Sequence, residues 1–309
     1  MSRIAVIDLG TNTFNLLIVE VNPDKTYQTV YQTKIAVKLG EGGINKGFIA
    51  PIPFRRGIDA LTAHNQTILK YNVDRIHAVA TSAIRGASNG AEFVATAKEE
   101  AGIDIRVISG DQEAELIYYG VRHAVQMNHE TSLIIDIGGG STEFIIANNN
   151  QILWKQSFLL GVARLLEMFN PSDPITDKEK QALVNYLLQE LQPLFDAVKK
   201  HPITELIGSS GSFDSMAEMV AHKFYSPHVL DGKTEFNFNL EYCKAIHELI
   251  LQSTLAERLQ MKGLVAMRVD MIVISSILVN FIVKSFEISQ MRLSTYSLKE
   301  GILFEVLNP

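Results

Sequence analysis

Short apolar runs recur along the chain, and small polar residues bound most of them. Apolar runs between Gly, Asn, Thr or Ser positions are typical of strands joined by tight turns. They predict strands over residues 4–9, 16–21, 27–37, 76–80, 106–108, 133–137, 144–147, 151–160, 205–207 and 291–294. Four glycines between positions 40 and 47 predict a loop after the third of these strands.

Other segments place apolar residues at helical spacing. Phe54, Ile58, Leu61, Ile68 and Leu69 recur at steps of three, four and seven, which predicts one apolar stripe on a helix over residues 53–71. The same reasoning predicts helices over residues 91–101, 112–125, 215–224, 239–255 and 270–286, with a short one at the C-terminal end.

Polar residues mark where several of these helices begin. Asp111 is the expected N-cap of the helix over residues 112–125, and Asn239 that of the helix which runs to Leu255. Thr176 and Glu179 form a T-x-x-E capping box. One long helix carrying leucines at positions 183, 187, 191 and 194 is expected to follow it.

Strands alternate with helices, so the sequence predicts an α/β fold with partly parallel sheets. The stretch 127–130 is the most polar one before the second set of strands. We therefore expect two domains, residues 1–127 and residues 128–309.

Composition and charge exclude several classes of protein. The 309 residues include 28 Lys and Arg against 34 Asp and Glu, a net charge of −6, which argues against a general basic field for nucleic acid. A single cysteine, Cys243, excludes a disulfide framework and fits a reducing cytoplasm. The apolar stretch 271–283 is too short for a membrane span, so we expect a buried helix there and no membrane partner.

The sequence contains an internal repeat. "IAVIDLGTNTFNLLIVEV" and "SLIIDIGGGSTEFIIANN" both read as strand, Asp, aliphatic residue, Gly, small polar turn and second strand. Asp8 corresponds to Asp136, a separation of 128 residues, and Thr13 corresponds to Ser141. Two copies, one in each half, predict two related domains that face each other across a cleft.

Such a pair of hairpins suits a phosphorylated ligand. A Gly-rich turn presents backbone N–H groups as an anion nest, and each copy adds one carboxylate, Asp8 or Asp136, to one wall of the cleft. Two carboxylates across a phosphate are typical of a Mg²⁺ that keeps several waters and contacts substrate oxygens.

This arrangement resembles the actin-like ATPase superfamily, which implies a duplicated actin-like (ribonuclease H-like) fold with two domains flanking a cleft. Further motifs resemble the exopolyphosphatase / guanosine pentaphosphate phosphohydrolase (Ppx/GppA) family in its short two-domain form. They are "DLGTNTF", "ATSAIRGASN", "ISGDQEAEL", "IDIGGGSTE", "GSSGS" and "LSTYSLKEGIL", in order along nearly the whole chain. Ser212 and Lys299 depart from this pattern, where Thr and Arg are more usual.

The resemblance implies roles for individual residues. From the residues alone, Glu113 is a first-turn glutamate that the helix dipole favours; the resemblance instead implies that it activates the attacking water. It makes Glu143 a second carboxylate near the metal or water, and Asp8, Asp136 and Glu143 the ligands of Mg²⁺ or Mn²⁺. The implied phosphate-binding residues are Thr11, Asn12, Thr13, Arg85, Gly138, Gly139, Gly140 and Ser141.

Two further groups complete the expected site. The "GSSGS" turn ends a strand and precedes a helix, an anion-binding geometry that adds Gly208, Ser209, Gly211 and Ser212 to the phosphate-binding residues. A local basic lining of Arg85, Arg122, Arg164 and Arg268 is expected to offset the acidic net charge.

The function implied is Mg²⁺-dependent release of terminal orthophosphate from inorganic polyphosphate, guanosine pentaphosphate or both, in a cytoplasmic homodimer. An alternative is a regulatory protein that binds polyphosphate or guanosine tetra- or pentaphosphate without hydrolysing it. A sugar kinase of the same superfamily needs an adenosine site and a sugar-binding insertion, and the sequence offers neither.

Overall fold

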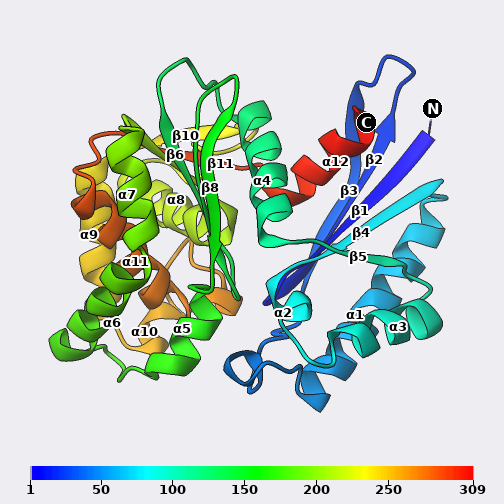
Figure 1. The fold of residues 1–309 in the computed structure, drawn as a ribbon, viewed down its shortest axis with the longest axis horizontal. Helices are drawn as coiled ribbons and strands as arrows, with labels where there is room; N and C mark the ends of the chain where they lie inside the picture. The colour runs from blue at the N-terminus through cyan, green and yellow to red at the C-terminus, as the bar shows by residue number, and fades with distance from the viewer. Residues whose placement is uncertain (1, 309) are drawn as a thin grey trace.

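The computed structural model describes residues 2–308 as two lobes, each built on one mixed sheet (Figure 1). Both chain ends lie on the N-terminal lobe, because the last helix returns from the C-terminal lobe to pack there. The lobes meet along two helices and at the loops that follow the first strand of each sheet.

The N-terminal sheet has five strands in the order β3-β2-β1-β4-β5. Their bounds are β1 Ser2–Leu9, β2 Thr13–Val21, β3 Tyr27–Ala36, β4 Arg75–Ala80 and β5 Ile105–Val107. The first three form an antiparallel meander, while β4 and β5 run parallel to β1. The run Ile4–Ile7 is fully buried because helices cover both faces of β1.

The C-terminal sheet has six strands in the order β10-β11-β9-β6-β7-β8. Their bounds are β6 Ser132–Ile137, β7 Thr142–Ala147, β8 Ile152–Phe158, β9 Glu205–Ser209, β10 Glu235–Phe238 and β11 Met291–Ser294. An antiparallel meander is again followed by two parallel strands, with β10 added antiparallel at the edge. The two sheets therefore share one topology, which confirms the duplication expected from the internal repeat.

Helices connect the strands and cover the sheets. They are α1 Pro51–Lys70, α2 Ser82–Arg85, α3 Gly90–Ala101, α4 Gly110–Ala124, α5 Val162–Phe169, α6 Asp177–Glu190, α7 Gln192–Lys200, α8 Ser210–Phe224, α9 Leu240–Gln252, α10 Leu255–Arg258, α11 Ile272–Ser285 and α12 Leu298–Leu307, with 3₁₀ turns η1 Ile44–Lys46 and η2 Ala266–Arg268. One core lies between the N-terminal sheet and α1 and α3, and a larger one fills the C-terminal lobe.

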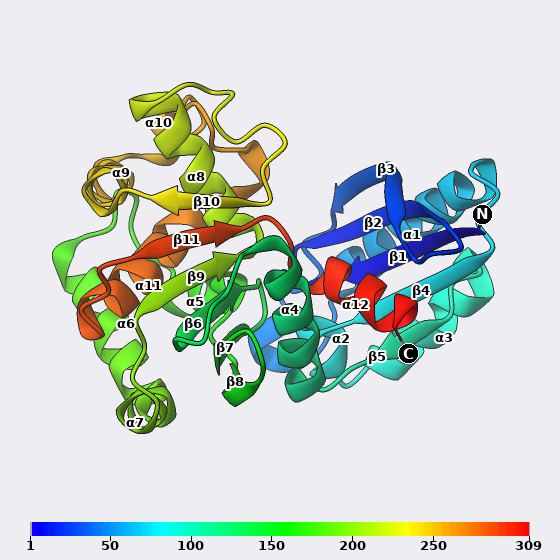
Figure 2. The ribbon, with the colours of Figure 1, turned by 90° about the horizontal axis from the view of Figure 1, so that it is seen from above.

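A third core joins the lobes. Helices α4 and α12 pack on each other and contribute residues to one cluster with strands of both sheets, including Ile4 and Val79 on one side and Ile134 and Ile145 on the other. Figure 2 shows the pair lying between the two sheets. The helix that begins with Gly110 is thereby fixed against both halves of the molecule.

Several local predictions were wrong. Ser109, not Asp111, caps α4, because its side chain pairs with Gln112 in a capping box. The long helix divides at Leu191, where Pro193 opens a second helix. The helix that Asn239 caps ends at Gln252 rather than Leu255.

The stripe on α1 also differs from the prediction, since Leu69 is exposed. By contrast, the apolar helix α11 is buried as expected, with ten of its residues inside the C-terminal lobe. Within the described residues, no helix is both long enough and apolar enough to span a bilayer.

Candidate active site

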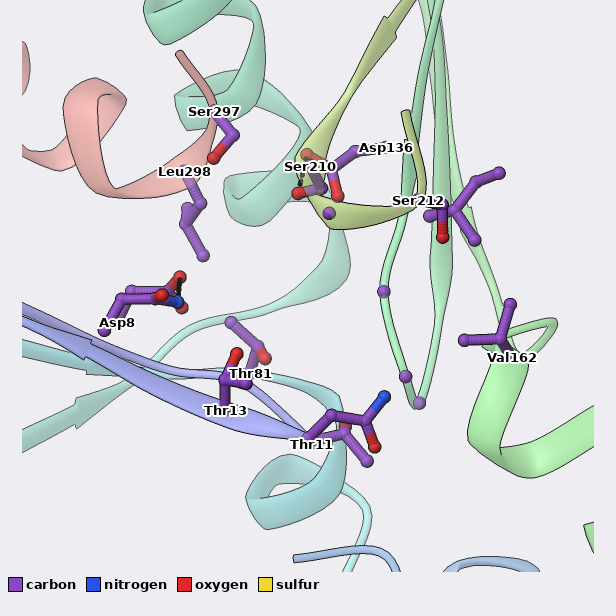
Figure 3. A pocket seen from close by; sticks show the side chains of 18 of the residues that line it. Asp8, Thr11, Thr13, Thr81, Asp136, Val162, Ser210, Ser212, Ser297 and Leu298 are labelled. Atoms are coloured by element: carbon purple, nitrogen blue, oxygen red, sulfur yellow. Dashed lines mark hydrogen bonds between the residues drawn. The ribbon is translucent and has the colours of Figure 1, made fainter. Parts of the chain in front are cut away.

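A cavity of about 210 Å³ lies between the lobes, at the ends of β1 and β6. The turns that follow these two strands form opposite walls, and Figure 3 shows Asp8 and Thr13 on one side with Asp136 and Ser210 across from them. Most of the residues expected to bind phosphate line it, namely Thr11, Asn12, Thr13, Gly138, Gly139, Gly140, Ser141, Gly211 and Ser212.

The two turns have the same backbone hydrogen bond. The N–H of Gly10 donates to Thr13 O at 3.1 Å, and the N–H of Gly138 donates to Ser141 O at 3.0 Å. This repeated turn leaves the intervening residues of each loop along the cavity wall. The geometry fits a nest for phosphate oxygens on either side of the cleft.

Glycine is required in the second turn because the first turn touches it. A Cβ on Gly139 would lie 2.4 Å from Asn12 Nδ2, and one on Gly140 would lie 2.5 Å from Thr11 Oγ1. Both distances are far shorter than a side chain tolerates. Gly139 and Gly140 therefore let the two turns pack in direct contact.

Asp8, which is half-buried, and Asp136, which is buried, lie on opposite walls. Asp8 Oδ2 accepts a hydrogen bond from Asn15 Nδ2 at 3.0 Å, and Asp136 Oδ2 accepts from Ser209 Oγ at 2.7 Å and Ser210 Oγ at 2.8 Å. Burial raises the pKa of Asp8 to about 7 and also raises the pKa of Asp136. Removal from water thus destabilises the charged form of both groups.

These two carboxyls fit a hard divalent cation. The hydrogen bonds of both fall on Oδ2, and Mg²⁺ ordinarily takes one or two protein carboxylates, with substrate phosphates and waters filling its other positions. Within residues 2–308, no three His, Cys, Asp or Glu side chains are arranged to hold a metal ion. The expected set of Asp8, Asp136 and Glu143 is therefore not gathered as three ligands.

Glu143 lies behind the cavity rather than in its lining. It pairs with Asp136 across the β6–β7 hairpin, as Asn15 pairs with Asp8 in the first hairpin. Ser157 Oγ donates to Glu143 Oε1 at 2.6 Å. Burial, followed by the charge of Glu113, raises the pKa of Glu143 well above its usual range.

Glu113 does line the cavity, from the first turn of α4. Arg85 Nη1 donates to Glu113 Oε2 at 2.8 Å, and the same guanidinium donates to Ile108 O at 2.9 Å. Burial raises the pKa of Glu113 to about 7, the positive charge of Arg85 opposes this shift, and Asp136 and Asp8 add to it. A carboxyl at this pKa is suited to take up and release a proton near neutrality.

Arg85 is therefore placed as a partner of Glu113 rather than in the cavity lining. Of the four arginines expected to form a basic lining, Arg268 alone lines the cavity. Arg122 lies over the Tyr118 ring, and Arg164 donates to Gly140 O and Ile44 O across the cleft. Arg122 therefore packs on a side chain of its own helix, and Arg164 links the two lobes.

Three lysines supply the positive charge that was expected from arginines. Lys34 and Lys38 reach the cavity from β3 and the residues after it, and Lys299 reaches it from the first turn of α12. Burial opposes the charge of Lys299, but Glu300, 2.8 Å from its ammonium, together with Asp214 and Asp8 raises its pKa. In the sequence, Lys299 was noted only because it stands where the family usually has Arg, and its position in the cavity lining was not predicted.

The "GSSGS" turn divides between two roles. Ser210, Gly211 and Ser212 line the cavity, and Ser210 has a left-handed backbone with φ of 67°. Gly208 and Ser209 do not line it. A Cβ on Gly208 would lie 2.1 Å from the Phe213 ring, so packing accounts for that glycine.

Ser82 is a cavity residue that the motifs did not single out. It stands inside "ATSAIRGASN", between β4 and the arginine that holds Glu113. The sequence does not show that Ser82 belongs to the cavity, because Gly140 and Thr11 come close to it only in the folded chain.

Comparison with known proteins places this site in a family. The model of the Ppx/GppA phosphatase family matches residues 17–309. A curated Haemophilus influenzae protein with the provisional name of exopolyphosphatase is 29% identical over 98% of this chain and 91% of its own length.

Solved structures agree with that match. An exopolyphosphatase from Cytophaga hutchinsonii is 40% identical, covering 99% of this chain and 98% of its own, with a TM-score of 0.96. The Aquifex aeolicus member of the Ppx/GppA family is 25% identical over 99% and 98%, with a TM-score of 0.80. The expected α/β class and duplicated actin-like fold are confirmed. With its motifs, its paired turns and these relatives in agreement, the chain belongs to the Ppx/GppA phosphatase family.

Proposed function

We propose that the chain is a Mg²⁺-dependent phosphohydrolase that releases terminal orthophosphate from inorganic polyphosphate, guanosine pentaphosphate or both. The observation that carries the proposal is the cavity in which Glu113 faces two Gly-rich turns from opposite lobes. The names of the Haemophilus and Cytophaga relatives support polyphosphate as a substrate.

The two turns bind the terminal phosphoryl group. Backbone N–H groups of Gly139 and Gly140 and the hydroxyls of Thr13 and Ser141 are donors placed along the cavity wall. Phosphate oxygens accept such hydrogen bonds, and the enclosed position increases their strength. The nest thereby fixes the phosphorus and stabilises the charge that spreads over its oxygens during transfer.

Glu113 orients and deprotonates the attacking water. Its pKa of about 7 leaves a substantial fraction ionised at neutral pH while keeping the carboxylate basic. Arg85 holds one of its oxygens at 2.8 Å and leaves the other to contact a water. The water then attacks the terminal phosphorus in line with the departing chain.

Asp8 and Asp136 are the residues that would hold Mg²⁺ or Mn²⁺. When bound, the cation supplies charge neutralisation at the phosphate oxygens. The cationic side chains of Lys34, Lys38, Arg268 and Lys299 line the same cavity, and they favour a polyanionic substrate despite the net charge of −6.

Phosphate release tests the proposal. The protein is incubated with long-chain polyphosphate, guanosine pentaphosphate or ATP, each with Mg²⁺ and each with excess chelator. We expect release from one or both of the first two substrates, loss of release on chelation, and little release from ATP. Tight binding of polyphosphate without any release overturns the hydrolase and favours a regulatory binding protein.

A further inference from the structure

The Ser82 hydroxyl is buried and has no partner. Ser82 is 3% exposed, and its Oγ forms no hydrogen bond within the described residues. Three other buried side-chain atoms in that part of the chain also lack partners, on His77, Asn149 and Asp270, but none of these residues lines the cavity between the lobes. Ser82 combines an unsatisfied polar atom with a position in the cavity wall.

An unpaired buried hydroxyl is unfavourable, since it loses hydrogen bonds to water and gains none in return. Native structures retain such groups where a missing ligand supplies the partner. A buried serine outside the cavity, Ser253, shows the ordinary outcome, because its hydroxyl donates to Ile250 O at 2.7 Å. The difference between the two serines points to a ligand at Ser82.

The surroundings of Ser82 identify which part of a ligand it meets. A Cβ on Gly140 would lie 2.8 Å from Ser82 Oγ and 2.5 Å from Thr11 Oγ1, so both hydroxyls converge beside the second Gly-rich turn. Ser82 also begins the single-turn helix α2, whose last residue, Arg85, holds Glu113. Ser82 is thus tied to the end of the cavity where the attacking water is activated.

We propose that Ser82 Oγ donates a hydrogen bond to a non-bridging oxygen of the terminal phosphoryl group. This inference rests on the proposed function and adds a substrate-binding residue to it. The partner is an acceptor that carries negative charge, which a phosphoryl oxygen provides and which makes the bond stronger than one between neutral groups. Every substrate of the proposed reaction ends in this group, so the contact is independent of chain length.

The test compares wild type with Ser82→Ala and the matched control Ser253→Ala. Orthophosphate binding in the presence of Mg²⁺ is measured by calorimetry, and kcat/KM is measured on tripolyphosphate and on long-chain polyphosphate. We expect Ser82→Ala to weaken phosphate binding and to lower kcat/KM by roughly 10- to 100-fold, the scale of a hydrogen bond to a charged group. The loss should be equal on both chain lengths, and Ser253→Ala should bind phosphate as wild type does.

Thermal unfolding without ligand gives an independent readout. Ser82→Ala removes an unpaired group, so its Tm should be at or above that of wild type, whereas Ser253→Ala loses a formed hydrogen bond and should melt lower. Wild-type phosphate affinity in Ser82→Ala, or a fall in its ligand-free Tm like that of the control, overturns the inference. If wild type itself neither binds phosphate nor cleaves polyphosphate, the proposed function fails instead.

Discussion

At the scale of single residues, Glu113 combines burial with one strong partner. Burial raises its pKa to about 7, and the Arg85 guanidinium at 2.8 Å limits that rise. The same contact fixes the direction of the carboxylate, because Arg85 is itself anchored to Ile108 O. A base with this pKa and a fixed orientation fits proton abstraction from a bound water at neutral pH.

Replacing Glu113 by Gln should abolish most of the activity. The amide keeps the shape of the side chain but cannot accept a proton, so kcat should fall by roughly 10² or more, the scale of a general base, with little change in substrate binding. Steady-state phosphate release and calorimetric binding measure the two effects. Glu115→Gln is the control, since Glu115 is exposed and pairs with Lys155. Near-wild-type turnover in Glu113→Gln contradicts the assignment.

The dependence of kcat/KM on pH should reflect the ionisation of Glu113 and the influence of Arg85 on it. The base must be ionised, so we expect kcat/KM to rise with pH through about 7, the pKa of Glu113 in the ligand-free protein. In Arg85→Gln the favourable charge is lost and the pKa of Glu113 rises, so the acidic limb should move to higher pH. A limb that stays in place in this variant shows that Arg85 does not tune the base.

At the scale of elements, the site depends on the crossing of α4 and α12. A Cβ on Gly301 would lie 1.8 Å from Leu116 O, and one on Gly120 would lie 2.2 Å from Ser297 O, so the two helix backbones are in contact. Helix α4 carries Glu113 near its start, and α12 carries Lys299 near its start. The glycine contact therefore sets the positions of two cavity residues at once.

Gly301→Ala should force these helices apart. Overpacking of a buried contact costs about 1–3 kcal/mol or more, and we expect Tm to fall by several degrees and turnover to fall with it. Glu305→Ala is the control on the same helix, because it removes only an exposed ion pair with Arg106. Unchanged Tm and turnover in Gly301→Ala contradict the close helix contact.

The helices and strands themselves were predicted from the sequence more successfully than their capping residues and their buried faces. The hairpins carrying Asp8 and Asp136 were foreseen because their pattern is local and occurs twice. Ser109 was missed as a cap because Asp111 is an equally good capping residue two positions later. Leu69 was misplaced because helical spacing does not show where the apolar face ends.

The composition of the cavity was harder to foresee. Lys34 lies outside the motifs, and Ser82 lies inside one that did not mark it as a site residue; both join the site through contacts between segments far apart in the chain. Arg164 has the charge expected of a phosphate ligand but is used to join Gly140 to the loop at Ile44. Charge type follows from sequence, whereas the direction of a long side chain depends on the packed lobes.

At the scale of the whole molecule, four carboxyls between the lobes have raised pKa values. Asp8 and Glu113 each reach a pKa of about 7, and Asp136 and Glu143 shift in the same direction, with burial as the first cause in every case. Below their unfolded pKa values, near 4, these groups are protonated in both states. Between about pH 4 and pH 7, these four carboxyls bind more protons in the folded state than in the unfolded state, while His64, His77 and His247, whose pKa values burial lowers, bind fewer.

The four carboxyls should therefore lower the stability of the ligand-free protein as pH rises through this range. The free energy of unfolding decreases with pH wherever the native state holds more protons, so their contribution to Tm should be larger at pH 5 than at pH 8. In Glu113→Gln one of these groups is absent, and the decrease should be smaller. Thermal unfolding of both proteins in chelator measures the effect, and an equal change of Tm from pH 5 to pH 8 in the two proteins contradicts the raised pKa of Glu113.

Oligomeric state and the cytoplasmic location stay predictions of the family resemblance. The central claim concerns the chemistry in the cavity, that water held by Glu113 attacks the terminal phosphorus. The most direct measurement is polyphosphate cleavage in ¹⁸O-labelled water, followed by mass spectrometry of the products. We expect one solvent oxygen in each released orthophosphate and none in the shortened chain. Label in the remaining chain, or no orthophosphate at all, contradicts it.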